Sequence, residues 1–294
     1  MTYLVGYSPF KDDECALELA CQLARTEGRT VDVLTVVPAG WKTAVAGDSD
    51  RDFEEWARSE GEACAAHAAE RLAQHPDVAG ASHWVSARSV PWALMEKAEE
   101  IGARCIVVGS GVNGLLGRVT VTSKADRLLH SSHIPVAVAP RGYHADEHAR
   151  VARMTVGFRD DDTAWTLLDQ VSALARQVGT SLRVVTFNIR HKTMVTNSVS
   201  GAEEMVFTAA HRQARRWLDE ALDHLHDQGF TDDEVTTELI DGRSWTEAID
   251  SLEWKDTDVL VIGSSVTHRL ASVFLGSSAT KILRKSPVPV IVVP

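Results

Sequence analysis

The feature that most constrains the fold of this chain is an internal repeat. Three segments recur in the same order in its two halves: TYLVG with RMTVG, CIVVGSGV with VLVIGSSV, and HIPVAVAP with PVPVIVVP. The copies are offset by 151 residues at the first match and by 154 at the other two. Such regularity indicates a duplicated unit, and the length allows two cores of roughly 145 residues each. We predict two domains, residues 1–141 and 153–294, with a polar linker at 142–152.

Within each copy, short apolar runs alternate with segments of helical periodicity. Five strands that alternate with helices predict a doubly wound, Rossmann-like α/β fold with a parallel five-stranded sheet and helices on both faces. The expected strand order in each copy is 3-2-1-4-5. In such folds ligands bind beyond the carboxyl ends of the strands, here at the loops after the first and fourth strands. The expected strands are residues 3–7, 30–38, 82–87, 104–109 and 135–139, and 154–158, 181–187, 235–240, 258–263 and 289–293.

Composition narrows the functional class. The net charge of −11 argues against a general nucleic-acid binder, which needs a basic face. No apolar run reaches the roughly 18–20 residues of a membrane span, and the N-terminus does not resemble a signal peptide. The four cysteines show no CxxC spacing, which favours buried thiols in a reducing compartment. We therefore expect a cytoplasmic protein without nucleic-acid or membrane partners.

The two loops that follow the fourth strands carry the strongest chemical signal. Each begins with Gly-Ser at the end of a strand, and a second serine follows that glycine by 14 residues at a predicted helix start. Glycine allows a ligand to approach the backbone closely, and a helix N-terminus favours phosphate. The alternative is that the later pair of residues in each loop only caps its helix, which would stabilise that helix by about 1 kcal/mol. The residues are Gly109, Ser110, Thr122 and Ser123 in the first copy, and Gly263, Ser264, Ser277 and Ser278 in the second.

On these residues the chain resembles a tandem member of the universal stress protein family, over nearly its whole length. The nucleotide-binding branch of that family carries G-x2-G-x9-G-[ST] after the fourth strand. The second copy matches at Gly263, Gly276 and Ser277, with Val266 in place of the second glycine. The resemblance implies ATP or AMP as the ligand, and two domains that pair through their last strands, with a homodimer of the whole chain as a further option.

The first copy departs further from the family pattern. It matches only at Gly109 and Ser123, with Val112 and Thr122 at the other two positions. We therefore expect a degenerate first site and a candidate site in the second copy, where Ser264 and Ser278 are supporting donors.

Neither copy keeps the family's aspartate at the end of the first strand. That position aligns with Ser8 and with Arg159, and the backbone position that would hold adenine aligns with Val36 and Phe187. The loss removes an acceptor for the nucleoside, although Arg159 would meet a phosphate if it turned inward.

Other patterns favour structural explanations. Gly109-x-Gly111-x-x-Gly114 fits the dinucleotide fingerprint, but it follows the fourth strand, not the first. The aspartates at 160–162 suit a helix N-terminus better than a metal site. Trp92 and Trp245, at equivalent positions, are expected to pack against the core.

The sequence favours a stress-response protein that acts by binding a ligand or partner, without turnover chemistry. No histidine pairs recognisably with an acidic residue and a nucleophile. Two alternatives stay open: a binder of a non-nucleotide small ligand, and a weak ATPase of the same fold group.

Overall fold

The computed structural model describes residues 1–8, 14–40, 48–190, 200–266 and 273–294. The first half of the chain contains β1 (Thr2–Tyr7), α1 (Glu14–Glu27), β2 (Thr30–Pro38), α2 (Asp48–Leu72), β3 (Gly80–Ala87), α3 (Val90–Glu100), β4 (Cys105–Gly109), α4 (Ser123–Ser131) and β5 (Val136–Ala139). The second half contains β6 (Arg153–Gly157), α5 (Asp162–Val178), β7 (Ser181–Ile189), α6 (Ser200–Asp227), β8 (Val235–Gly242), α7 (Trp245–Asp250), β9 (Asp258–Gly263), β10 (Ser265–Val266), β11 (Val273–Phe274), α8 (Ser277–Lys285) and β12 (Val290–Val293).

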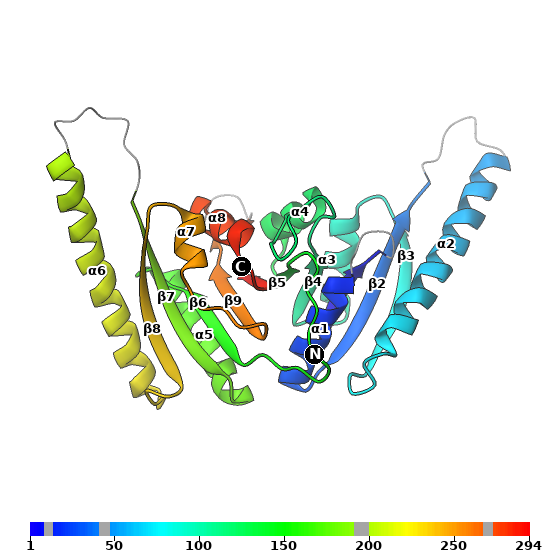
Figure 1. The fold of residues 1–294 in the computed structure, drawn as a ribbon. Coiled ribbons are helices and arrows are strands. Elements are labelled where there is room, and N and C mark those ends of the chain that lie inside the picture. Colours follow the sequence, from blue (N-terminus) through cyan, green and yellow to red (C-terminus); the bar gives the residue numbers. More distant parts are fainter. Residues whose placement is uncertain (9–13, 41–47, 191–199, 267–272) are drawn as a thin grey trace.

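Ten strands form one continuous sheet in the order β3-β2-β1-β4-β5-β12-β9-β6-β7-β8 (Figure 1). Read outward from the middle, each half has the expected order 3-2-1-4-5, and its strands are parallel. The halves join where β5 and β12 pair antiparallel, with Val138 opposite Val290. The predicted fold class and the pairing through the last strands are confirmed. The short hairpin of β10 and β11 is an addition that the sequence did not predict.

Two hydrophobic clusters lie on opposite faces of this sheet. Successive strand residues point to opposite faces, so Val107 and Val261 belong to the cluster beneath α1, α2, α5 and α6. Their neighbours Ile106 and Leu260 belong to the cluster beneath α3, α4, α7 and α8. Each cluster contains residues from both halves, so the core is continuous across the β5–β12 junction.

The tryptophans at equivalent positions have different environments. Trp245 is half-buried and packs against the core, as expected. Trp92 is 66% exposed, so the expectation that it packs against the core was wrong. It follows Pro91 in the first turn of α3, where it points to solvent.

All four cysteines are buried and free, in agreement with the prediction of buried thiols. Among the helices that the structure describes, none is long and apolar enough to cross a bilayer.

The segment between β5 and β6 is held against the first half by specific polar contacts. The backbone N–H of Val151 donates to Thr26 Oγ1 at 2.9 Å. Asp77 accepts from Arg25 Nε at 2.7 Å, and its Oδ2 lies 3.1 Å from Nδ1 of His148. Arg25 is buried, and its hydrogen bond holds the pKa of the Asp77 carboxyl well below its usual range.

The junction of the two halves should contribute strongly to stability. Val290→Ala removes two methyl groups from a fully buried position opposite Val138. We expect the free energy of unfolding to fall by about 2 kcal/mol, from lost burial and the cavity left behind. Urea denaturation followed by circular dichroism measures it. Val206→Ala, at a 70% exposed position of α6, is the matched control and should change stability by less than about 0.5 kcal/mol. An equal loss of stability in the two variants would contradict a strong contribution of the β5–β12 junction to stability.

The Asp77 contacts predict a pH dependence of stability. A carboxyl whose pKa is lower in the folded chain stabilises the fold above its unfolded pKa of about 3.9, and this contribution is lost as the pH falls through the folded pKa. Asp77→Asn should therefore cost about 1.5–3 kcal/mol at pH 7, and about 1 kcal/mol less than that at pH 3. Denaturation at both pH values tests this, with the exposed Asp146→Asn as control. A cost that is the same at pH 7 and pH 3 would show that the ion pair is not responsible.

Candidate functional site

The candidate site in the second half lies beyond the carboxyl end of β9. Gly263 ends this strand, Ser264 follows it, and α8 begins after Gly276. Between them, β10 and β11 pair antiparallel and bring the two ends of the loop together. The backbone of Val266 in β10 is described, but the side chain of Val266 is not. The structure thus places Gly263 and Ser264 on the strand side of this loop, and Gly276 to Ser278 on its helix side.

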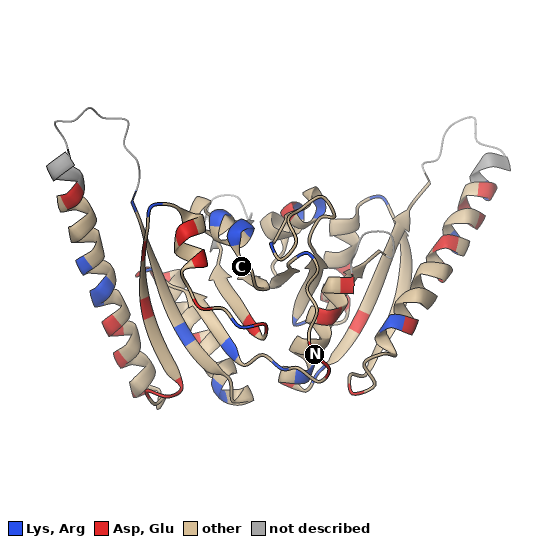
Figure 2. Ribbon diagram, in the orientation of Figure 1, with Lys and Arg blue, Asp and Glu red and all other residues tan. Residues whose placement is uncertain are grey.

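In the part of the chain that the structure describes, no side chain caps the N-terminus of α8. Gly276 occupies the N-cap position and offers no side-chain hydrogen bond, while Ser277 and Ser278 are exposed. The first backbone N–H groups of a helix have no intrahelical acceptor, and they carry the positive end of the helix dipole. The first turn holds no acidic residue, and the last turn is basic, with Arg284 and Lys285 (Figure 2). This end of α8 therefore suits an anion.

The fold itself does not explain why residue 276 is glycine. Its φ of −57° and ψ of 157° are open to any residue. A Cβ built there meets no atom of the described residues within 4 Å. At Gly263 a Cβ would make only ordinary contact, 3.5 Å from Leu167. Close approach of a ligand to the backbone remains as a physical reason for glycine at the start of α8.

Ser264 is buried, and its hydroxyl has no hydrogen-bond partner within the described structure. Its counterpart Ser110 is equally buried, but its hydroxyl is fully used. It donates to the Ala139 carbonyl oxygen at 2.6 Å and accepts from the Thr120 N–H at 3.0 Å. Leaving a buried hydroxyl unpaired costs about 1–3 kcal/mol, so the second site holds a polar group that a ligand would satisfy.

In the first half, the helix N-terminus is already capped. Thr122 Oγ1 accepts from the Ala125 N–H at 3.1 Å, and Asp126 adds a negative charge to the first turn of α4. Ser123 at the next position is exposed and makes no cap. The capping alternative is thus correct for Thr122, whereas neither Ser277 nor Ser278 caps α8.

The glycine-rich run of the first half serves to close its own loop. The Gly111 N–H donates to the Thr120 carbonyl at 2.9 Å, and a Cβ at Gly114 would lie 2.0 Å from Thr120 Oγ1. Val112 in this loop is 41% exposed. Arg118, from the same loop, pairs with Asp250 of α7 at 2.7 Å and so ties the first half to the second. These contacts account for the sequence that fits a dinucleotide fingerprint.

An aromatic pair lies at the position expected to meet a nucleoside. The ring centroids of Phe187 in β7 and Trp245 at the start of α7 are 5.8 Å apart, and both side chains are half-buried. The indole Nε1 of Trp245 is buried without a hydrogen-bond partner in the described part of the chain. In the first half the equivalent position is Val36, an aliphatic residue half-buried against the core.

Sequence and structure comparisons agree on what the chain is related to. The universal stress protein family profile matches residues 1–140 and 151–294. Universal stress proteins of Mycobacterium tuberculosis (strain ATCC 25618 / H37Rv) and Mycobacterium bovis (strain ATCC BAA-935 / AF2122/97) are each 36% identical to it over 296 residues, with 100% of both chains covered. The chain belongs to the universal stress protein family.

Solved structures show the same tandem fold. A crystal structure of a universal stress protein from Archaeoglobus fulgidus DSM 4304 matches with a TM-score of 0.64 and 13% identity, and covers 99% of this chain and 97% of that one. A functionally unknown protein from Pseudomonas aeruginosa PAO1 matches with a TM-score of 0.53 and 16% identity, with 99% and 91% covered. At these identities the likeness concerns the fold alone.

The residues that replace the aspartate of the universal stress protein motif do not complete the site. Arg159 does not turn inward: its side chain is 74% exposed, and its Nη2 lies 3.0 Å from Asp161 Oδ2. Asp161 in turn caps α5 by accepting from the Ala164 N–H at 2.9 Å. Burial raises the pKa of Asp161, but these hydrogen bonds and one from Thr163 lower it overall. Ser8 is half-buried just after β1.

The aspartates at 160–162 open a helix, as expected. Asp161 is the N-cap, and Asp160 accepts from the Trp165 Nε1–H at 2.9 Å. No cluster of metal-binding side chains occurs among the residues that the structure describes.

A polar cluster at the carboxyl ends of β7 and β8 escaped the sequence analysis. Asn188 donates to Asp241 Oδ1 at 2.7 Å, and Asp241 Oδ2 lies 2.9 Å from Nδ1 of His211 on α6. Asn188 and Asp241 are polar residues near the ends of two neighbouring strands, and this pattern could have indicated them from the sequence. The position of His211 depends on how α6 packs, which no local pattern reveals.

The different capping of the two helices makes a measurable prediction. Thr122→Ala should lower the free energy of unfolding by about 1 kcal/mol, because the α4 N-terminus loses its cap. Ser277→Ala, in the first turn of α8, should change it by less than about 0.5 kcal/mol, because its hydroxyl makes no cap. Chemical denaturation of both variants measures these changes in the free energy of unfolding. A loss of similar size for both would mean that α8 is capped in solution.

Proposed function

We propose that this universal stress protein is an adenine-nucleotide sensor in which the second half binds ATP or AMP and the first half is its structural partner. It acts through ligand occupancy and partner contact rather than turnover, in response to stress. Four buried, free thiols support a reducing compartment, the cytoplasm, as its place of action.

The observation that carries the proposal is the difference between two corresponding serines. The Ser110 hydroxyl is satisfied within its loop, and Thr122 caps the helix beyond it. Among the described residues, the Ser264 hydroxyl is buried without a partner, and the helix that begins after Gly276 has no side-chain cap. A phosphate accepts hydrogen bonds from hydroxyls and from helix N-terminal N–H groups. The second half supplies both, at positions where the family motif has its phosphate contacts.

The aromatic pair supports an adenine base at the other end of the ligand. The rings of Phe187 and Trp245 offer an apolar surface, and the Trp245 Nε1, which has no partner among the described residues, is a donor for a ring nitrogen. Arg159 is directed away and paired with Asp161, so the nucleoside lacks the acidic partner of the family motif. The β-branched Val266 replaces a glycine where the main chain would meet the phosphates. We therefore expect binding weaker than the complete motif would give.

Calorimetric titration with ATP tests the proposal on the full chain. Wild type should bind one ATP per chain, and Gly276→Val should abolish binding because its methyl groups occupy the phosphate position. The change should leave the fold intact, since a Cβ at this position meets nothing within 4 Å among the residues that the structure describes. The matched control is Thr122→Val, the corresponding position of the first half, which should keep wild-type affinity. Identification of small molecules released from denatured protein complements the titration.

Three results would contradict the proposal. Absence of heat at millimolar ATP, with no nucleotide released on denaturation, would favour a different ligand at this loop or protein partners. Loss of binding in Thr122→Val but not in Gly276→Val would move the site to the first half. Release of ADP during the titration would instead favour the weak ATPase.

A further inference from the structure

The two helices beside the proposed nucleotide site are joined at their far ends by one residue of the first half. Helix α7 begins with Trp245, and α8 begins just after Gly276. Arg118, in the loop after β4, pairs through Nη2 with Asp250 Oδ1 at 2.7 Å, and its Nη1 donates to the Lys285 carbonyl oxygen. Asp250 is the last residue of α7, and Lys285 is the last residue of α8. One guanidinium group thus holds the C-termini of both helices.

The chemistry of arginine suits this place. The planar guanidinium group presents several N–H donors in fixed directions, so it can hold two acceptors at a set separation. The last carbonyl groups of a helix have no intrahelical donor and carry the negative end of the helix dipole, so a cation stabilises them. The side chain of Arg118 is 30% exposed, and it is therefore partly enclosed where the two halves meet.

The first half also contacts the other end of α8. The N–H of Leu275, one residue before the N-cap Gly276, donates to Nδ1 of His130 in α4 through a long hydrogen bond of 3.5 Å. Leu275 itself is buried. The first half therefore holds α8 both just before its first residue and at its last residue. A helix of nine residues separates these contacts by about 13 Å, so together they restrict the tilt of α8 as well as its position.

The sequence provides the residues for these contacts in one direction only. By the offset of 154 residues, the counterpart of Arg118 is Ser272, and the counterpart of His130 is Arg284. Serine carries no guanidinium group, and arginine has no nitrogen that accepts a hydrogen bond. Helix α4 is instead capped within its own half by Thr122. The contacts are thus directed from the first half to the second, where we place the nucleotide site.

We propose that Arg118 is a positioning residue for the nucleotide site of the second half, and this inference rests on the function proposed above. By fixing α7 relative to α8, it sets the distance between the Trp245 ring and the start of α8. A nucleotide that spans these two places binds best when their separation is fixed in advance. Arg118 lies at the opposite ends of both helices, so it acts through them and not by touching the ligand.

Calorimetric titration of the full chain with two probes tests this role. ATP reaches both parts of the site, whereas inorganic tripolyphosphate reaches only the start of α8. Arg118→Met removes the guanidinium group and should weaken ATP binding about tenfold. Tripolyphosphate binding should not change, because His130 still holds the start of α8. The matched control is Arg127→Met, at an exposed position of α4, which makes the same change in charge and should leave both affinities at their wild-type values.

A double-mutant cycle connects the effect to the ion pair. Asp250→Ala removes the partner of Arg118 and should also weaken ATP binding. Arg118→Met should weaken ATP binding less in the Asp250→Ala background than in wild type, because the two side chains act through one contact. Additive effects of the two changes would show that Arg118 does not act through Asp250.

Three further results would overturn this inference. Wild-type affinity for ATP in Arg118→Met would show that the site does not depend on Arg118, although the proposed function would stand. An equal loss of affinity for ATP and tripolyphosphate in this variant would mean that the change only weakens the fold. A wild-type chain that binds no ATP would contradict the proposed function and this inference together.

Discussion

The antiparallel pairing of β5 with β12 is the contact on which the rest of the structure depends. The edge strand of each half alone would present unpaired backbone groups beside apolar side chains, which invites aggregation. Pairing the two edges satisfies those groups and buries Val138 and Val290 completely. It also makes the core on each face of the sheet continuous across the halves. The duplicated units therefore form one ten-stranded body. The two halves can then diverge, because each is stabilised by the other.

Divergence is clearest in the loops after β4 and β9. Both follow the same strand of the repeated unit, but their polar groups are used differently. In the first half, Ser110, Thr120 and Thr122 satisfy one another and the start of α4, while Arg118 reaches across to Asp250. A group that is already paired gains little by exchanging its partner for a ligand. In the second half, Ser264 and the start of α8 keep donors that no described residue uses. The same topology thus yields a structural loop and a loop that suits an anion.

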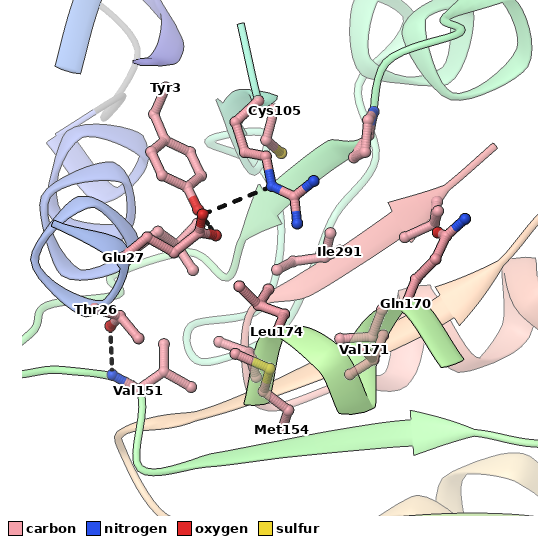
Figure 3. A pocket seen from close by; sticks show the side chains of 16 residues that line it. Tyr3, Thr26, Glu27, Cys105, Val151, Met154, Gln170, Val171, Leu174 and Ile291 are labelled. Atoms are coloured by element: carbon pink, nitrogen blue, oxygen red, sulfur yellow. Dashed lines mark hydrogen bonds and ion pairs between the residues drawn. The ribbon is translucent and has the colours of Figure 1, made fainter. Parts of the chain in front are cut away.

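The junction has a further consequence beneath α1 and α5. Side chains as far apart in the chain as Tyr3 and Ile291 line one pocket there, which neither half forms alone (Figure 3).

The repeat and the alternation of apolar runs with helical segments predicted the fold class and the strand order, because periodicity is local and duplication repeats one topology. The pairing of the last strands was implied by the resemblance to the universal stress protein family. Tertiary packing decided the rest. Trp92 and Trp245 hold equivalent places in the sequence, yet only Trp245 packs against the core. The inward turn considered for Arg159 is not observed, because its exposed side chain pairs with Asp161 instead. Whether Ser110 or Ser264 finds a partner depends on atoms brought together by the loop closure. Such contacts join residues distant in sequence, so local sequence patterns do not predict them.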